Sequence, residues 1–140
     1  MPLQIHPEQG TIVICDFQGM IPPEMNKRRP VVIISPRLRK RQRLCTIVPL
    51  STTEPNPIEA YHHRLHIEPS LPSPYSSKLC WAKADMIYTV SFDRLYLPFK
   101  SKNGDGKRQY DIRIIDKSDL VMIQRCILHG IGMTALTDFL

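Results

Sequence analysis

The sequence predicts a mainly β fold, a small barrel with one C-terminal α-helix. Short apolar segments rich in β-branched residues recur between residues 10 and 115, and such segments are typical of strands. Connections rich in proline and glycine separate them, and a helical apolar period occurs only after residue 116. Because the strands do not alternate with helices, the pattern argues against a parallel βαβ sheet. The 140 residues are most simply one domain, 1–140.

Three strands are predicted in the first third of the chain, at residues 10–17, 31–35 and 44–50. Each segment is short and apolar, and Pro30 stands just before the second, where a missing N–H is tolerated. Residues 18–29 are too rich in Gly and Pro for a regular element and are expected to form a long loop. Loops of this length in compact domains are often functional.

Shorter strands are expected to follow. Residues 61–67 alternate in the period-two pattern of a half-exposed strand. After an irregular loop at 68–77, residues 78–90 have strand character and are expected to form two short strands around 83–85. Ser91 can then cap a single helical turn.

The chain is predicted to end with a hairpin and a helix. The Asn-Gly and Asp-Gly pairs within residues 97–109 predict a protruding hairpin or a mobile loop, with 110–115 as its returning strand. The helix follows, with Asp116 or Ser118 as its cap, an apolar stripe of Leu120, Ile123, Ile127 and Ile131, and an end near Gly130 or Gly132.

Positive charge is concentrated in one stretch of the chain. The formal net charge is +6, and residues 26–43 hold eight of the nineteen Lys and Arg. Such clustering favours a polyanionic partner, because basic side chains release counterions from phosphates. We therefore take Arg39 and Arg41, in the basic connection 36–43, as candidate RNA contacts. The alternative is a solvated loop that keeps the protein soluble.

Cysteine spacing and hydropathy limit the classes of protein further. The four cysteines lie far apart without a C-x-x-C pair, so Cys15 and Cys45 are expected to be reduced core residues. No apolar run approaches the roughly 18 residues of a membrane span, and no signal peptide is recognised. We expect a cytoplasmic protein without membrane association.

Two polar segments could together handle a phosphodiester. Arg29 enters a strand through Pro30, and Ser51, Thr52 and Thr53 follow the end of another strand. RNA carries its own nucleophile, the 2′-hydroxyl, so cleavage needs proton transfer and stabilisation of the charge on phosphorus. The planar guanidinium of an arginine suits the phosphate, and hydroxyl or backbone N–H donors can support it.

The same residues have plainer interpretations. Lys27, Arg28 and Arg29 could be ordinary loop cations, and the three hydroxyls could be a polar turn. Lys27 and Arg28 are otherwise candidate RNA-binding residues, as are Ser51 and Thr53. Glu24 could accept a proton or pair with Lys27 or Arg28.

Other candidates for chemistry are weaker. His62, His63 and His66 could act as acids or bases, but in a strand His63 points away from the other two. Further zinc ligands cannot be identified, so no metal and no cofactor is predicted. Trp81, Tyr75 and Phe17 could stack on unpaired bases, although single aromatic residues are more often part of a core.

The order and spacing of these segments resemble the PemK/MazF family of toxin endoribonucleases. The resemblance covers most of residues 10–95. The residues that carry it are the segments Gly-Thr-Ile-Val-Ile-Cys-Asp-Phe at 10–17, Pro-Glu-Met at 23–25, Arg-Pro-Val-Val-Ile-Ile-Ser-Pro at 29–36, Val-Pro-Leu-Ser-Thr-Thr at 48–53, Trp-Ala-Lys-Ala-Asp-Met-Ile at 81–87, Thr-Val-Ser at 89–91 and Arg-Leu at 94–95.

This resemblance implies an SH3-like barrel of the MazF/CcdB type, a homodimer, and the toxin of a type II toxin–antitoxin system. It implies metal-independent, sequence-selective cutting of single-stranded RNA, with 2′,3′-cyclic phosphate and 5′-hydroxyl products, and hence inhibition of translation and growth. A cognate antitoxin would occlude the groove in which the RNA is cut. By position, Arg29 matches the family's catalytic arginine, Thr52 its catalytic threonine, and Glu24 a contributing acid. Arg28 departs from the pattern, because a familiar member has His there, and the segments 37–43 and 100–108 have no match.

Two other functions remain open at this point. One is a CcdB-like toxin that poisons gyrase by binding it through a C-terminal helix. The other is a non-catalytic nucleic-acid-binding or autoregulatory module, which would bind RNA with a steep salt dependence and leave it intact.

Overall fold

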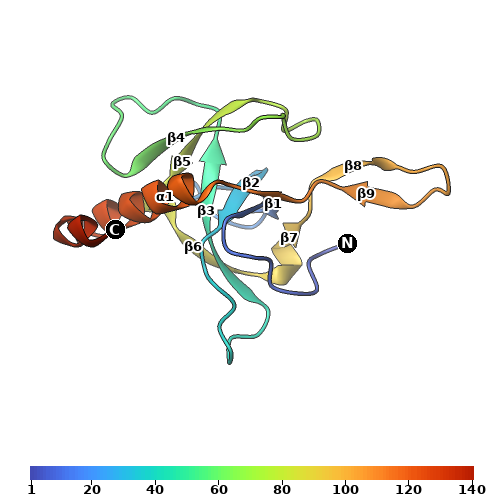
Figure 1. Ribbon diagram of the computed structural model, residues 1–140, viewed down its shortest axis with the longest axis horizontal. Coiled ribbons are helices and arrows are strands. Elements are labelled where there is room, and N and C mark those ends of the chain that lie inside the picture. The colour runs from blue at the N-terminus through green and yellow to red at the C-terminus, as the bar shows by residue number, and fades with distance from the viewer.

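A computed structural model describes all residues, 1–140. It shows a bent antiparallel sheet with one helix across it and a hairpin projecting on the other side (Figure 1). The elements, in chain order, are β1 (Thr11–Asp16), β2 (Arg28–Ile33), β3 (Leu44–Ser51), β4 (His62–His66), β5 (Leu79–Lys83), the 3₁₀ turn η1 (Ala84–Met86), β6 (Tyr88–Ser91), η2 (Phe92–Arg94), β7 (Leu95–Tyr96), β8 (Phe99–Lys102), β9 (Arg108–Tyr110), β10 (Arg113–Ile114), α1 (Lys117–Gly130) and η3 (Thr134–Phe139).

The sheet closes on itself through η2. β3 pairs with β2 along one edge and with β6 and then β5 along the other. β1 pairs with β2 on one side and with β10 and β7 on the other. Because η2 carries the chain from β6 directly to β7, the strands wrap around from β3 back to β1. The predicted mainly β barrel with a C-terminal helix is confirmed.

β1, the second half of β2 and most of β3 are buried on both faces, which explains why their sequences are continuously apolar there. One face lines the barrel interior, where Val31, Ile33 and Ile47 belong to a core cluster of 12 buried residues. The opposite face, with Val32 and Val48, packs under β4, β5 and α1 in a second cluster of 12. The two cores lie on opposite faces of the same central strands.

The helix α1 covers the second core. Ile123 and Cys126 are its buried residues, and it begins after Asp116, whose side chain makes no capping hydrogen bond. Gly130 ends the helix against η1, where an added Cβ would lie 3.1 Å from the Asp85 Cα. A side chain there would have to push the backbone of η1 away. None of the helices is long and apolar enough to span a lipid bilayer.

Most predicted strand boundaries differ from the structure by one or two residues, and two differ by more. β2 begins at Arg28 rather than at residue 31, because Arg28 and Arg29 pair with Asp16 and Cys15 of β1. The returning strand of the hairpin stops at Tyr110, and Arg113–Ile114 pairs with β1 instead. In both cases a partner strand far away in sequence sets the boundary, which local patterns do not reveal.

The predicted turns are confirmed. The β8–β9 hairpin projects from the barrel (Figure 1), and the Asn103 side chain accepts hydrogen bonds from the backbone N–H groups of Asp105 and Lys107 at 2.9 and 3.0 Å. Ser91 caps η2 by accepting from the Asp93 N–H at 3.1 Å. Short polar side chains bond locally to the backbone in the manner that the sequence indicates.

Candidate functional site

A cavity of about 610 Å³ lies where β2 begins and β3 ends. Antiparallel pairing puts the start of one strand beside the end of the next. Val31 pairs with Pro49, and continuing this register by two residues sets Arg29 opposite Ser51. The 67–77 loop and β5 complete the wall of the cavity.

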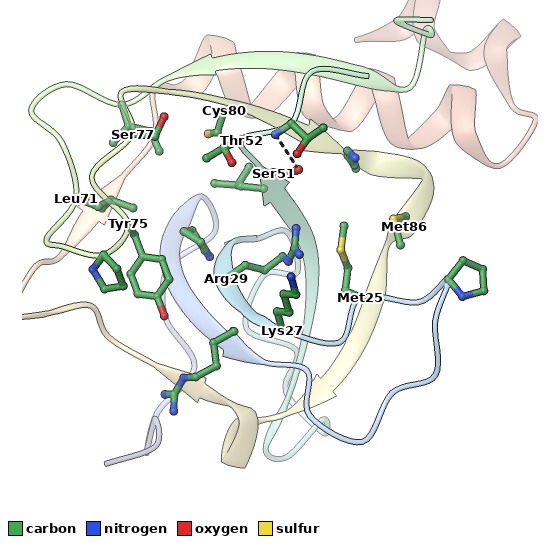
Figure 2. Close-up of a pocket in the computed structure, with 18 residues that line it drawn as sticks. Met25, Lys27, Arg29, Ser51, Thr52, Leu71, Tyr75, Ser77, Cys80 and Met86 are labelled. Atoms are coloured by element: carbon green, nitrogen blue, oxygen red, sulfur yellow. Dashed lines mark hydrogen bonds between the residues drawn. The ribbon is translucent and has the colours of Figure 1, made fainter. Parts of the chain in front are cut away.

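Arg29 is the central cation of this cavity. It lies on the same face of β2 as Val31 and Ile33, which are fully buried in the barrel interior. Figure 2 shows its guanidinium directed toward the end of β3, with Lys27 beside it. The Arg29 Nε is buried and has no hydrogen-bond partner. A buried donor without a partner costs free energy. The residue as a whole is half-buried and forms no ion pair, so the rest of its guanidinium is available to an acceptor such as a phosphate oxygen.

Three hydroxyl residues at the end of β3 and just after it line the same cavity, namely Ser51, Thr52 and Thr53. Ser51 is buried, and its Oγ accepts a hydrogen bond from the Thr53 N–H at 3.2 Å, the dashed line in Figure 2. This turn exposes Thr52, whose hydroxyl remains free to donate to a ligand. The arrangement offers hydroxyl and guanidinium donors to the same anion.

The cavity is positively charged without compensation. Its lining includes Lys27, Arg28, Arg29 and Lys83 but no Asp or Glu, and none of the four forms an ion pair. Uncompensated cations with partly low-dielectric walls raise the local concentration of anions.

Lys83 was not among the predicted site residues. The local sequence does not mark it, because a lysine at the end of an apolar strand is usually an ordinary solvated residue.

Of the predicted site residues, six line this cavity and three do not. Those that line it are Lys27, Arg28, Arg29, Ser51, Thr52 and Thr53. Glu24 is exposed in the preceding loop, where its Oε1 accepts from the Ile21 N–H at 3.1 Å, and it forms no ion pair with Lys27 or Arg28. A catalytic role for Glu24 stays a prediction.

Arg39 and Arg41 lie at the opposite end of β3 from Thr52, in the connection between β2 and β3. Arg41 Nη2 donates to Thr89 Oγ1 at 3.1 Å, and the neighbouring Arg43 forms an ion pair with Asp93 at 2.7 Å. Part of the basic segment is therefore bound to the protein's own surface. Contact between Arg39 or Arg41 and RNA stays a prediction.

The histidines of β4 are separated. His63 Nε2 lies 2.9 Å from Asp119 Oδ1 and ties β4 to α1, whereas the His62 Nδ1 accepts from the Glu59 N–H at 3.0 Å. No group of three His, Cys, Asp or Glu side chains in the chain is arranged to hold a metal ion.

Of the aromatic candidates, Phe17 and Trp81 are buried. Tyr75 lines the cavity.

The cysteines are free and buried, in agreement with the expectation for Cys15 and Cys45. Burial raises the pKa of Cys80, which lines the cavity, to about 12, and burial raises the pKa of Cys15 to about 12 as well. Burial also raises the pKa of Cys45 and of Cys126 to about 11. A thiolate is therefore disfavoured at neutral pH, and Cys80 is unsuited to act as a nucleophile.

We predict that none of the four thiols of the folded protein reacts readily with Ellman's reagent at pH 8. Because the reagent needs the thiolate, a raised pKa suppresses the reaction, and unfolding in urea returns each pKa toward its usual value and releases all four. The measurement is the absorbance of the released thiol with and without urea. Rapid reaction of one thiol in the folded protein would contradict the burial described above.

Comparison with other proteins agrees with this fold. The chain is 29% identical to the protein YifN of Escherichia coli (strain K12). The alignment has 159 positions and covers 99% of this chain and all of the relative. It is 28% identical, over 96% of both chains, to a protein of Haemophilus influenzae. A crystal structure of MazF from Deinococcus radiodurans has a TM-score of 0.64 at 15% identity, covering 91% of this chain and 97% of that one.

A structure described as an endoribonuclease in complex with its cognate antitoxin, from a mycobacterial species, has a TM-score of 0.59 at 17% identity and covers 91% of this chain and 97% of that one. At such identities the likeness shows the fold. The family itself is shown by a match of residues 8–128 to the model of the PemK-like, MazF-like toxins. The chain therefore belongs to the PemK-like, MazF-like toxins of type II toxin–antitoxin systems.

Proposed function

We propose that this protein is an endoribonuclease that cuts single-stranded RNA at short sequences without a metal ion, and thereby inhibits translation and growth. The observation that supports it best is the buried, unpartnered Nε of Arg29, opposite the hydroxyls of Ser51 and Thr52. A guanidinium held in this state is prepared for an anion that binds in the cavity. The phosphodiester of RNA supplies such an anion together with its own nucleophile.

In the proposed reaction, the 2′-hydroxyl of the RNA loses its proton to solvent water as its oxygen forms a bond to the adjacent phosphorus. The bond from phosphorus to the 5′-oxygen breaks, and that oxygen leaves with the electron pair and takes up a proton from water. The products are a 2′,3′-cyclic phosphate and a 5′-hydroxyl. Arg29 holds the non-bridging oxygens, where negative charge increases in the transition state, and Thr52 donates to the same group.

Charge stabilisation carries most of the proposed rate enhancement. The lining contains neither carboxylate nor imidazole, and arginine is a poor base because its pKa is high. Lys27 and Lys83 add positive charge around the phosphate. Action of Glu24 as the proton acceptor would require its loop to bring the carboxylate into the cavity.

We also propose that the protein forms a homodimer and has a cognate antitoxin that covers the positive cavity. The mycobacterial endoribonuclease is described in complex with an antitoxin, and this chain shares its fold. An acidic partner segment would compensate the four unpaired cations and exclude RNA. A small acidic reading frame beside the gene would support this assignment.

The test is to incubate the purified protein with a long mixed-sequence RNA in EDTA and to map the ends. We expect discrete cuts, with new 5′ ends that polynucleotide kinase labels directly because they carry a hydroxyl. Intact RNA in EDTA and in the presence of magnesium would overturn the proposal and leave a protein-binding toxin. Cuts that need magnesium, or that leave 5′-phosphates, would overturn the mechanism.

A further inference from the structure

A second cavity of about 370 Å³ adjoins the one that holds Arg29. Arg28, Pro74 and Tyr75 line both cavities, so the two spaces adjoin at these residues. The volume lies within the range of about 300–1,000 Å³ that is typical of small-molecule sites. Figure 2 shows Tyr75 at the side of the first cavity, with its hydroxyl directed away from Thr52.

The lining of this second cavity combines aromatic rings with arginines. Four aromatic residues line it, and they are Tyr75, Tyr96, Phe99 and Tyr110. Its two charged residues, Arg28 and Arg108, are both cationic, and no Asp or Glu is present. Arg28 lies over the Tyr96 ring at 4.8 Å, and Arg108 lies over the Phe99 ring at 5.3 Å.

The projecting hairpin supplies one side of this cavity. Phe99 opens β8, and Arg108 and Tyr110 belong to β9, so the two strands of the hairpin bring all three to the cavity. The Phe99 and Tyr110 rings meet edge to face, with centroids 6.2 Å apart. The segment that the sequence marks as basic and unmatched therefore has a defined position next to the proposed site of cleavage.

We propose that this second cavity binds an unpaired nucleotide of the RNA next to the scissile phosphate, with its base held against the rings of both Tyr75 and Tyr96. This inference rests on the proposed function and adds a subsite to it. Aromatic faces accept any unpaired base, and arginines beside them hold the backbone phosphate and stack on bases as well. Because Arg28 lines both cavities, one strand can pass from Arg29 into the aromatic cavity without leaving the positive surface.

The charge of the cavity distinguishes this ligand from a peptide. An apolar protein segment would leave Arg28 and Arg108 without acceptors, whereas a nucleotide supplies a phosphate and a π-face together. The site is thus predicted to set affinity and preference at one position of the RNA while the chemistry occurs beside Arg29.

The test uses a short RNA with one cut site mapped with the wild-type protein. The ribose that carries the attacking 2′-hydroxyl is replaced by 2′-deoxyribose, so that the RNA binds without being cut. In two separate RNAs, 2-aminopurine replaces the base on one side of the cut or the base on the other side. We expect quenching of 2-aminopurine fluorescence at one of the two positions on binding. Tyr75→Leu and Tyr96→Leu should each remove the quenching and weaken binding by about tenfold to a hundredfold.

The matched controls separate a stacking role from a structural one. Tyr75→Phe and Tyr96→Phe keep the ring and should restore binding and quenching. Tyr61→Leu removes a half-buried tyrosine that lines neither cavity and should leave binding unchanged. Its ring meets the His62 ring edge to face, with centroids 4.6 Å apart. With cleavable RNA, the two leucine variants should raise KM and leave kcat nearly as it is.

Two outcomes would overturn the subsite and leave the proposed function standing, provided that the wild-type protein cuts RNA. One is the absence of quenching at both positions, and the other is wild-type RNA affinity in both leucine variants. Loss of antitoxin binding with unchanged RNA affinity in those variants would assign the cavity to the protein partner instead. If the wild-type protein cuts no RNA at all, the proposed function fails first and the subsite falls with it.

Discussion

Arg29→Ala is expected to lower the rate of RNA cleavage by about a thousandfold or more, since loss of a single oriented donor to developing charge already costs about 10²–10³. The side chain combines positive charge with a planar pair of donors, and the variant loses both. Arg29→Lys keeps the charge without the fork and should recover only a small part of the activity. The measurement is the single-turnover rate on an RNA with one mapped cut site.

The folded state should not suffer from this change. The Arg29 Nε is buried without a partner, so this nitrogen costs desolvation that no contact within the protein offsets. We therefore expect the Tm of Arg29→Ala to be unchanged or slightly raised. Arg64→Ala is the matched control, because Arg64 is exposed on β4 and does not line the cavity. Full activity in Arg29→Ala, or equal losses in both variants, would move the site elsewhere.

Thr52→Val is expected to reduce kcat by about a hundredfold while KM changes little, because the lost hydroxyl donates mainly to the charge of the transition state. Valine keeps the shape and β-branching of threonine, so the turn after β3 should remain in place. Thr52→Ser retains the hydroxyl and should keep most of the activity. Thr52 is exposed, so no large effect on stability is expected.

Binding measurements distinguish this role from simple RNA affinity. An RNA with 2′-deoxyribose at the cut should bind to Thr52→Val almost as tightly as to the wild-type protein. A large loss of affinity would make Thr52 a ground-state contact, and unchanged kcat would remove it from the site.

The local sequence was sufficient for the elements and for part of the site. β-branched apolar segments, the Asn-Gly pair and the cap at Ser91 each depend on neighbours within a few residues. Of the predicted helical stripe, Ile123 is buried, whereas Ile131 lies past the end of α1 and is 54% exposed. The Arg29–Pro30 entry and the hydroxyls at 51–53 follow from the same local chemistry, and the structure places both in one cavity.

Long-range pairing decided the rest, because residues separated by tens of positions meet only when a register is chosen. The pairing of Val31 with Pro49 sets Arg29 opposite the end of β3, and it sends Arg39 and Arg41 to the other end of the same strand. β5 then contributes Lys83, the 67–77 loop contributes Tyr75, and the two strands of the hairpin contribute to a second, aromatic cavity. A local pattern states what each segment can form, whereas the cross-strand contacts that determine its neighbours exist only in the folded chain.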